Sequence, residues 1–480
     1  MGLGGGGTAY LQGGESLFVN PANLYFNDRQ KKTQISLIQS GFHFDALLPF
    51  DNRSDQFRKY RKTLILHEYS NELTRLNNDE RATLIKRNYP NGAEKRNLMS
   101  QADLKWLGIS WIDKDRAYAI ALRTRIGNHY QIGKGIYTET SSRPEEFGVI
   151  NQSFFQRYQV LHEVSFGYSE SFTFLNGQNP GQSEFIVGIA PKLVIAAGGF
   201  EVGYRNIYSM DESNSDWNRE IEFSQISSGL FSENDVRTFS SRFPNDHLTP
   251  DAGYRNLFEP TGYGAGIDLG ITYQIHFNPN YSTLNQNLRE PERSLRFSVS
   301  ITDVGLMRIK NDPYQFELSE EQSGRAGIGP LSDVIFTGVP NEFYHFLSDF
   351  GDLPNFESGT ETREAYNRLL PASMQTGFLF HYDWFKVVAD ASYTVIENAF
   401  KPDGIVSYFG TEIRPFTFLP LRAGTRVSKN YTPYYSFGAG FETPSFDINA
   451  AIIFNSGDNN DPGISSEIVG ASVIGFIFHL

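Results

Sequence analysis

Eleven charged side chains occupy the polar faces of segments in which apolar and polar residues alternate. If those segments form one closed wall, the charges share an enclosed space, because alternate side chains of a strand point to opposite sides. Two interpretations stay open: a paired network that holds parts of the protein together, or cations that receive an anionic head group such as a carboxylate. The eleven residues are Arg123, Arg125, Glu163, Lys192, Asp268, Arg296, Lys386, Asp390, Glu412, Arg422 and Arg426.

No pattern in the sequence supports covalent catalysis or a cofactor. Residues 2–7 formally match a GxGxxG fingerprint, but that fingerprint needs a preceding strand, for which there is no room. The nine histidines form no HExxH pair, and no GxSxG elbow occurs. The absence of cysteine excludes disulfides, thiolate catalysis and cysteine-bound zinc. We therefore expect neither enzyme activity nor a cofactor.

Metal binding has one weak candidate. The stretch Asn455 to Gly463 is rich in oxygen ligands, so external calcium is conceivable. It lacks the spacing of an EF-hand and its closing glutamate, which favours an ordinary polar loop. His276, His381 and His479 fall on inward faces, where a solvated position is the simpler interpretation. We expect no metal.

The segments that carry the charges are predicted to be β-strands. In "YGAGIDLGITYQIH", every second residue from Tyr263 to Ile275 is apolar, and the residues between are glycine or polar. "FKVVADASYTV" alternates in the same way from Phe385 to Val395, with Val388 as the exception. A period of two over such lengths predicts strands with one apolar and one wet side.

The pattern recurs about fourteen times along the chain. An even number is what a bacterial barrel with both termini at one end requires, and short turns alternate with longer polar loops, as in outer-membrane barrels. The strands are predicted near residues 33–46, 103–112, 116–127, 155–169, 184–206, 261–276, 293–308, 372–382, 386–396, 405–415, 419–428, 434–443, 445–455 and 470–480.

Three long insertions interrupt the pattern, at about 47–102, 207–260 and 309–371. All three fall on the long-loop side of the predicted wall. "NNDERATLIKR" in the first insertion and "ETREAYNRLL" in the third are predicted to be short helices, the former with a capping Asn78 or Asp79.

Composition bounds the class of protein. The 480 residues carry a net charge of −13, which argues against a nucleic-acid binder. No apolar run of about 18 residues predicts a membrane helix, and a mean hydropathy of −0.38 is compatible with a membrane barrel whose faces average out. No charged and apolar leader precedes the glycine run, so we treat the chain as a mature form whose export signal has been removed.

Both ends of the chain carry further signals. The final stretch "ASVIGFIFHL" places Ile474, Phe476, Phe478 and Leu480 on one face, an apolar last strand of the kind that barrel assembly machinery reads. The first residues, 1–32, are predicted to fold back into the lumen as a hatch, because a barrel of about fourteen strands is too wide for its own side chains to fill. Glycines 2 and 4–7 allow close approach, and Leu17, Phe18 and Leu24 supply apolar contacts.

The opening "GLGGGGTAYLQGGESLFVNPANL" resembles the N-terminal hatch of the FadL-like outer-membrane family, the long-chain fatty-acid transporters. Members of that family carry a glycine-rich lead and then an Asn-Pro-Ala signature, here Asn20, Pro21 and Ala22. "SVSITDVGLMR" and "GTEIRPFTFLPLRAGTRVS" look like strand pairs of a branch that also resembles the PorV-type barrels of type IX secretion. The resemblance implies a plugged barrel that admits small hydrophobic molecules from outside. The family's ligand positions do not carry over.

We therefore predict an all-β transmembrane barrel, with residues 1–32 as hatch and residues 33–480 as wall, in the outer membrane of a Gram-negative bacterium. The expected function is passive transport of small hydrophobic or amphipathic compounds. Its partners are then outer-membrane lipid and a small ligand, and not nucleic acid. The alternative is a non-transporting scaffold or type IX secretion accessory that contacts a surface or secretion-system protein through its long loops. A soluble β protein is a third possibility.

Overall fold

The coordinates are a computed structural model of the chain. The structure describes residues 2–26, 32–44, 82, 85–86, 88–89, 92–137, 149–172, 183–210, 217–229, 259–277, 293–324, 358–429, 431–455 and 468–480.

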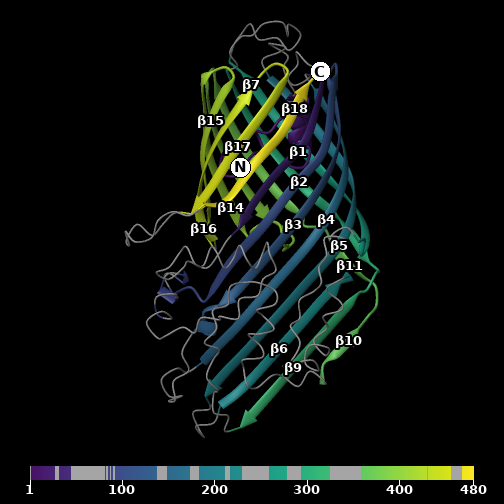
Figure 1. Ribbon diagram of the computed structural model, residues 1–480, viewed down its shortest axis with the longest axis vertical. Helices are drawn as coiled ribbons and strands as arrows, with labels where there is room; N and C mark the ends of the chain where they lie inside the picture. Colours follow the sequence, from purple (N-terminus) through teal and green to yellow (C-terminus); the bar gives the residue numbers. More distant parts are fainter. Residues whose placement is uncertain are drawn as a thin grey trace.

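Within these residues, fourteen antiparallel strands close into one barrel (Figure 1). Each strand pairs with the next in the order below, and the last pairs with the first, Gln34 lying opposite His479. The barrel strands are β1 (Thr33–Phe44), β2 (Lys95–Asp113), β3 (Arg116–Gly133), β4 (Val149–Phe172), β5 (Ser183–Met210), β7 (Gly262–His276), β8 (Arg293–Ile309), β12 (Ser373–Tyr382), β13 (Phe385–Thr394), β14 (Ile405–Phe416), β15 (Leu419–Ser428), β16 (Tyr431–Glu442), β17 (Phe446–Asn455) and β18 (Ile468–His479). The prediction of a fourteen-stranded barrel is confirmed.

The wall of the barrel is apolar outside and polar inside, the reverse of a soluble β protein. On β7, Leu269 and Ile271 are 41% and 47% exposed, whereas their neighbours Asp268 and Thr272 are fully buried. Soluble monomers rarely expose extended apolar patches, so the outward apolar side chains indicate that this face contacts a membrane or another protein.

Exposed aromatic side chains gather at the tight-turn end of the barrel. Tyr382 and Trp384 flank the turn between β12 and β13, and Phe416 and Phe418 stack with ring centroids 5.5 Å apart at the turn between β14 and β15. Amphipathic and aromatic rings of this kind mark the interface of a bilayer with water.

The last strand contributes to the same outer surface. Phe476 and Phe478 of β18, and Leu480 directly after it, are exposed on the outer face of the barrel. The side chain of Ile474 lies outside the described residues, as does most of the polar stretch that begins at Asn455.

Four further strands extend the sheet beyond the barrel at the long-loop end (Figure 1). The second half of the 28-residue strand β5 pairs with β6, β6 pairs with β9, and β9 pairs with β10, while β11 pairs with the end of β8. The four are β6 (Trp217–Ser228), β9 (Tyr314–Gly324), β10 (Thr360–Thr362) and β11 (Tyr366–Leu369).

These strands correct two expectations for the insertions. The stretch "ETREAYNRLL" is not a helix, because its residues form β10 and β11 on the free edges of β9 and β8, where hydrogen bonds to a neighbouring strand outweigh helix propensity. The first insertion ends at residue 94, since β2 begins at Lys95. In the other predicted helix, the described residues Ala82, Ile85 and Lys86 are helical, and the capping candidates Asn78 and Asp79 lie outside the described residues.

The other helical elements among the described residues are short 3-10 helices: η1 (Gly13–Glu15), η2 (Pro21–Phe26) and η4 (Lys134–Tyr137). Among the residues described, none of the helices has the length and apolar character needed to traverse a bilayer.

Candidate functional site

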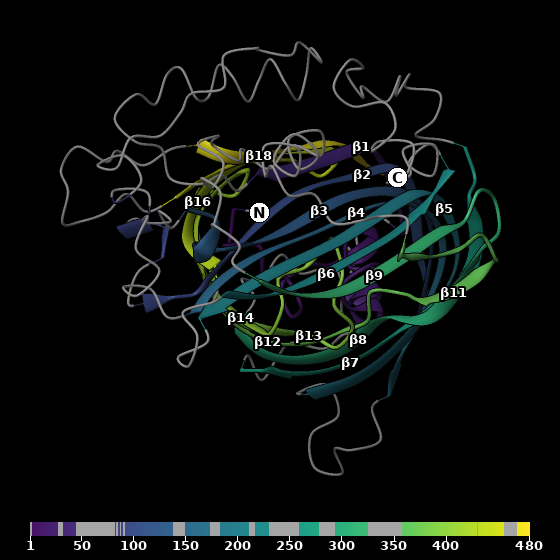
Figure 2. The same ribbon diagram turned by 90° about the horizontal axis from the view of Figure 1, so that it is seen from below.

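The N-terminal segment, residues 2–26, lies inside the ring of strands (Figure 2). Its backbone approaches inward-facing glycines so closely that a Cβ on Gly188 of β5 would overlap Ala22, and one on Gly424 of β15 would overlap Leu3. Since β5 and β15 stand on nearly opposite sides of the ring, the segment crosses the lumen.

The Asn20 side chain ties this segment to itself and to the wall. Its Nδ2 donates to the carbonyl oxygen of Thr8 at 3.1 Å and to Oγ1 of Thr272 on β7 at 2.9 Å, and its Oδ1 accepts from the backbone nitrogen of Ala22 at 3.2 Å. Pro21 then opens η2 at a position where a missing N–H costs nothing. The turn at Asn20 and Pro21 is therefore fixed both in its conformation and in its position against the wall.

The glycine run closes around a carboxylate of the wall. Gly4 and Gly5 have φ angles of +78° and +96°, the left-handed region that favours glycine. The backbone amides of Gly7 and Ala9 face the carboxylate of Asp390 on β13. Both oxygens of this carboxylate are nevertheless buried without a hydrogen-bond partner among the described residues.

A buried ion network surrounds the Phe18 ring. Its members, here called the Phe18 cluster, are Phe18, Arg123, Arg125, Glu163, Lys192, Asp268 and Asp303. Arg123 Nη2 lies 2.6 Å from Glu163 Oε2, and its guanidinium carbon lies 3.9 Å from the centre of the Phe18 ring. Lys192 Nζ lies 2.7 Å from a carboxylate oxygen of both Asp268 and Asp303. The N-terminal segment thus rests on the cations of a paired network.

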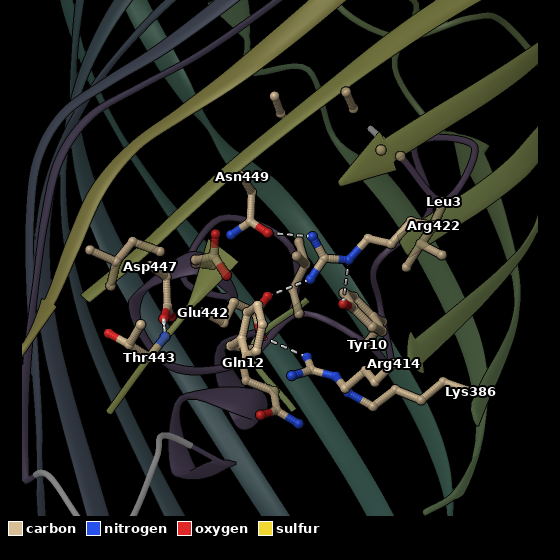
Figure 3. Close-up of a pocket in the computed structure, with 18 of the residues that line it drawn as sticks. Leu3, Tyr10, Gln12, Lys386, Arg414, Arg422, Glu442, Thr443, Asp447 and Asn449 are labelled. Carbon is tan, nitrogen blue, oxygen red and sulfur yellow. Dashed lines mark hydrogen bonds and ion pairs between the residues drawn. The ribbon is translucent and has the colours of Figure 1, made fainter. Parts of the chain in front are cut away.

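A second network holds the segment nearer the tight-turn end (Figure 3). Its members, the Tyr10 cluster, are Tyr10, Lys386, Glu412, Arg414, Arg422 and Glu442. Glu412 accepts from Arg422 Nε at 2.7 Å and from Arg414 Nε at 2.9 Å, and both arginines also bind Glu442. The Tyr10 hydroxyl donates to Glu412 and accepts from Arg422. Burial raises the pKa of the Tyr10 phenol well above its usual value, so it stays a donor.

Two cavities lie against the N-terminal segment. One of about 700 Å³ is lined by Tyr10, Gln12 and Glu15 together with the Tyr10 cluster and the turns at the tight-turn end. The other, of about 290 Å³, is lined by the glycine run, Phe18 and residues nearer the long-loop end. Gly6 and Leu11 line both. The segment therefore separates two chambers of one lumen.

The loop between β13 and β14, residues 395–404, folds into the barrel over the smaller chamber. Phe400 is buried under the guanidinium of Arg125 at 4.8 Å, and Lys401 Nζ donates to the hydroxyls of Thr302 and Ser373. The backbone nitrogen of Asp403 donates to the Tyr431 hydroxyl at 3.1 Å. This loop closes the chamber on the side away from the N-terminal segment.

The packing of this loop is expected to weaken as the pH rises. Burial raises the pKa of Asp403 to about 6, with Glu397 adding to the shift and Arg157 opposing it. Because the folded pKa exceeds the ordinary value of about 4, the stabilisation is complete below about pH 4 and is lost as the pH rises through about 6.

A thiol probe measures this effect cleanly, since the chain has no cysteine. We expect the alkylation rate of Ala399→Cys, divided by that of the exposed control Ser445→Cys, to rise severalfold between pH 4.5 and 7.5. Asp403→Asn should flatten the profile. An unchanged profile in that variant would assign the pH response to another group.

The other predicted inward residues also meet the segment or the chambers. Arg296 donates to the carbonyl oxygen of Ala9 at 3.0 Å, and its guanidinium lies 3.5 Å from the centre of the Phe26 ring. Arg426 lies over the Tyr434 ring. Of the inward histidines, His479 lies 2.8 Å from Asp447, and His276 and His381 lie near the tight-turn end.

Sequence reasoning missed several residues that the structure adds to these networks. Arg414 and Glu442 share the polar face with Glu412 and Arg422, so the same alternation could have found them. Asp303 turns inward at a bulge where its φ is +61°. Tyr10 carries no such signal, because the N-terminal segment has no period.

Within the described part of the chain, no group of histidine or acidic side chains could hold a metal ion.

Comparison with known proteins gives a family and a set of similar folds. Residues 57–450 match the profile of a family described as a family of unknown function, DUF5723. No curated protein sequence matches the chain.

Among solved structures, the chain is similar to barrels described as channels and transporters. A deltaS2S3 mutant of the monoaromatic hydrocarbon channel TodX has a TM-score of 0.45 and 12% identity over 100% of this chain and 97% of that one. The Ralstonia pickettii toluene transporter TbuX has a TM-score of 0.42 and 10% identity over 100% and 97%. A Pseudomonas aeruginosa FadL homologue has a TM-score of 0.36 and 10% identity over 98% and 94%. The expected resemblance to FadL-like barrels is thus found, and at these identities it extends to no ligand.

Proposed function

The chain belongs to the DUF5723 family, and from its inside-out wall and occupied lumen we propose that it is an outer-membrane channel for small hydrophobic or amphipathic compounds. The apolar outer face and the aromatic side chains at the tight-turn end support insertion in a bilayer. In this orientation the tight turns and the C-terminal residue face the periplasm, and the long loops face outside.

One observation carries the proposal: a segment of irregular backbone separates two chambers within a closed wall. A solute that enters the smaller chamber can reach the larger one only when residues 2–26 shift. The contacts that hold the segment are separate hydrogen bonds and ion pairs rather than a continuous sheet, so they can be exchanged one after another. This arrangement supports passage by diffusion without an energy source.

The test is uptake of radiolabelled toluene by intact Gram-negative cells that carry the protein in their outer membrane. Asn20→Ala removes the side chain that fixes the carbonyl of Thr8, and Thr8 lines the smaller chamber. We expect toluene uptake to rise by up to about tenfold, because the segment that has to shift has lost hydrogen bonds worth about 1–3 kcal/mol. Wild-type uptake no faster than in cells without the protein would exclude the proposal.

The matched control is Asn311→Ala, which removes one bond to the carbonyl oxygen of Pro260 at an exposed site. Its uptake should equal that of the wild type. Equal changes in both variants would trace the effect to expression or folding.

The extended sheet supports a second candidate. Strands β6, β9 and β10 continue β5 beyond the barrel on one side and present a broad surface for a protein partner. In that case the protein is a scaffold or a secretion accessory. Two results together would favour it. Cells with the protein would take up toluene no faster than cells without it, and a stoichiometric partner would co-purify with the wild type but not with a variant that lacks residues 217–228.

A further inference from the structure

Arg426 of β15 differs from four other arginines of the lumen. Arg123, Arg125, Arg414 and Arg422 each pair with carboxylates. Arg426 is 7% exposed, and its Nη2 has no hydrogen-bond partner among the residues that the structure describes. Within the same residues it forms no ion pair. Its guanidinium carbon lies 4.0 Å from the centre of the Tyr434 ring, a contact that offsets only part of the cost of burying a charge.

The environment of Arg426 is the smaller chamber. Arg426 lines that cavity together with the aromatic rings of Tyr408 and Tyr434, which lie opposite it on the two neighbouring strands. Phe18 and Phe400 line the same space from the N-terminal segment and from the loop 395–404. A guanidinium cannot shed its proton to relieve its burial, so it needs an anion.

A second cation lines the chamber without a carboxylate. Lys401 Nζ is held by the hydroxyls of Thr302 and Ser373, and within the described ranges it forms no ion pair. Besides the paired Arg123, Arg125, Asp103 and Asp303, the chamber thus offers the buried Arg426, the partly buried Lys401 and four aromatic faces. Its volume of about 290 Å³ is at the lower limit of small-molecule sites. An extended long acyl chain exceeds this space, whereas a single aromatic ring with one head group fits it.

We propose that the smaller chamber binds compact aromatic carboxylates, with the carboxylate on Arg426 and the ring among Tyr408, Tyr434, Phe18 and Phe400. The inference deepens the proposed function, on which it rests for the route by which such an anion arrives. Bidentate pairing of a carboxylate with a guanidinium supplies the specificity, because two parallel N–H groups match two oxygens. Ring contacts add affinity without selecting charge.

The first experiment needs no variant. The purified full chain in detergent is titrated by calorimetry with benzoate and with benzamide, which have the same ring and the same size but differ in charge. We expect benzoate to bind saturably and about tenfold or more tightly than benzamide, the strength of a charged hydrogen bond. Undetectable benzoate binding, or equal affinities for the two compounds, overturns the proposal.

The second experiment assigns the effect to Arg426. Arg426→Gln should lower benzoate affinity by about ten- to a hundredfold and leave benzamide unchanged, while Arg426→Lys keeps most of the difference between them. The control Arg116→Gln alters an exposed ion pair at the far end of the barrel and should bind as the wild type does. Benzoate affinity in Arg426→Gln equal to that of wild type refutes the assignment. If that variant fails to fold, the lysine variant decides: benzoate binding as weak as benzamide in it means that the charge is not what binds.

Failure of this inference differs from failure of the channel. Toluene uptake that persists while benzoate binds no better than benzamide leaves the channel and removes the anion site. Benzoate binding that depends on Arg426, without any toluene uptake, leaves the site and removes the channel for neutral compounds.

Discussion

Deleting the first 26 residues of this sequence is expected to turn a blocked barrel into an open pore. The fourteen strands hydrogen-bond to one another without help from this segment, and β1 begins at Thr33, so the wall remains closed. The lumen left behind is too wide for its own side chains to fill. In planar bilayers we expect conductance to rise on the order of tenfold or more, with little dependence on solute chemistry.

The charges that the segment covers add a second expectation. Removal exposes the charged wall residues of the Phe18 and Tyr10 clusters to water, so the conductance of the pore should depend on ionic strength beyond the effect of bulk conductivity. A deletion variant that folds, as judged by heat-modifiable migration, yet conducts no more than the full chain would show that residues 2–26 do not block the lumen. The conductance of Asn20→Ala should lie between those of the full chain and the deletion variant, because this substitution loosens the segment without removing it.

Glu412→Gln is expected to be the most damaging single change in the lumen. The Glu412 carboxylate is fully buried and compensates Lys386, Arg414 and Arg422, and it accepts the Tyr10 hydroxyl. Its loss leaves Arg414 and Arg422 on the single carboxylate of Glu442, and Lys386 without an ion pair among the described residues. Breaking a buried ion network from one side costs about 3–5 kcal/mol. The free energy of unfolding, measured by urea titration in lipid vesicles, should fall by that amount.

The matched control is Glu222→Gln on β6. Glu222 also pairs with an arginine, Arg205, at 3.2 Å, but both side chains are nearly half exposed. Exposed pairs contribute about 0–1 kcal/mol, so this variant should unfold almost as the wild type does. Equal losses in the two variants would mean that burial of the Tyr10 cluster has no energetic weight.

Alternation predicted the wall well because the wall separates two media. The predicted strand 419–428 coincides with β15, and the strand predicted at 445–455 with β17 to within one residue. Beyond the part of the barrel that has an apolar outer face, the two faces of the sheet no longer differ in polarity, and the prediction from alternation fails. The first eight residues of β2 and the strands β6 and β10 lack a clear period, and all of them lie beyond the barrel strands predicted near them.

The inner networks were predictable only in part. Residues in phase with their strand, such as Glu163, Lys192 and Glu412, could be assigned to the inner face from position alone. Asp303 could not, because a bulge opposite Asp268 changes the phase: the exposed residues are Phe297 and Val299 before it and Val304 and Leu306 after it. The sequence does not show which inward cation lacks a carboxylate partner, because Arg426 and Arg422 both lie on the inner face of β15. Only the contacts in the folded structure distinguish them.

The junction of β1 with β18 dictates an order of events during biogenesis. Thr33 and Leu480 exchange two backbone hydrogen bonds across almost the whole length of the chain. A pairing so distant in sequence forms late, after local hairpins have zipped together. Residue 26 stands only seven positions before Thr33. We therefore expect the N-terminal segment to enter the lumen before β1 pairs with β18, so that closure of the barrel retains a segment that is already in place.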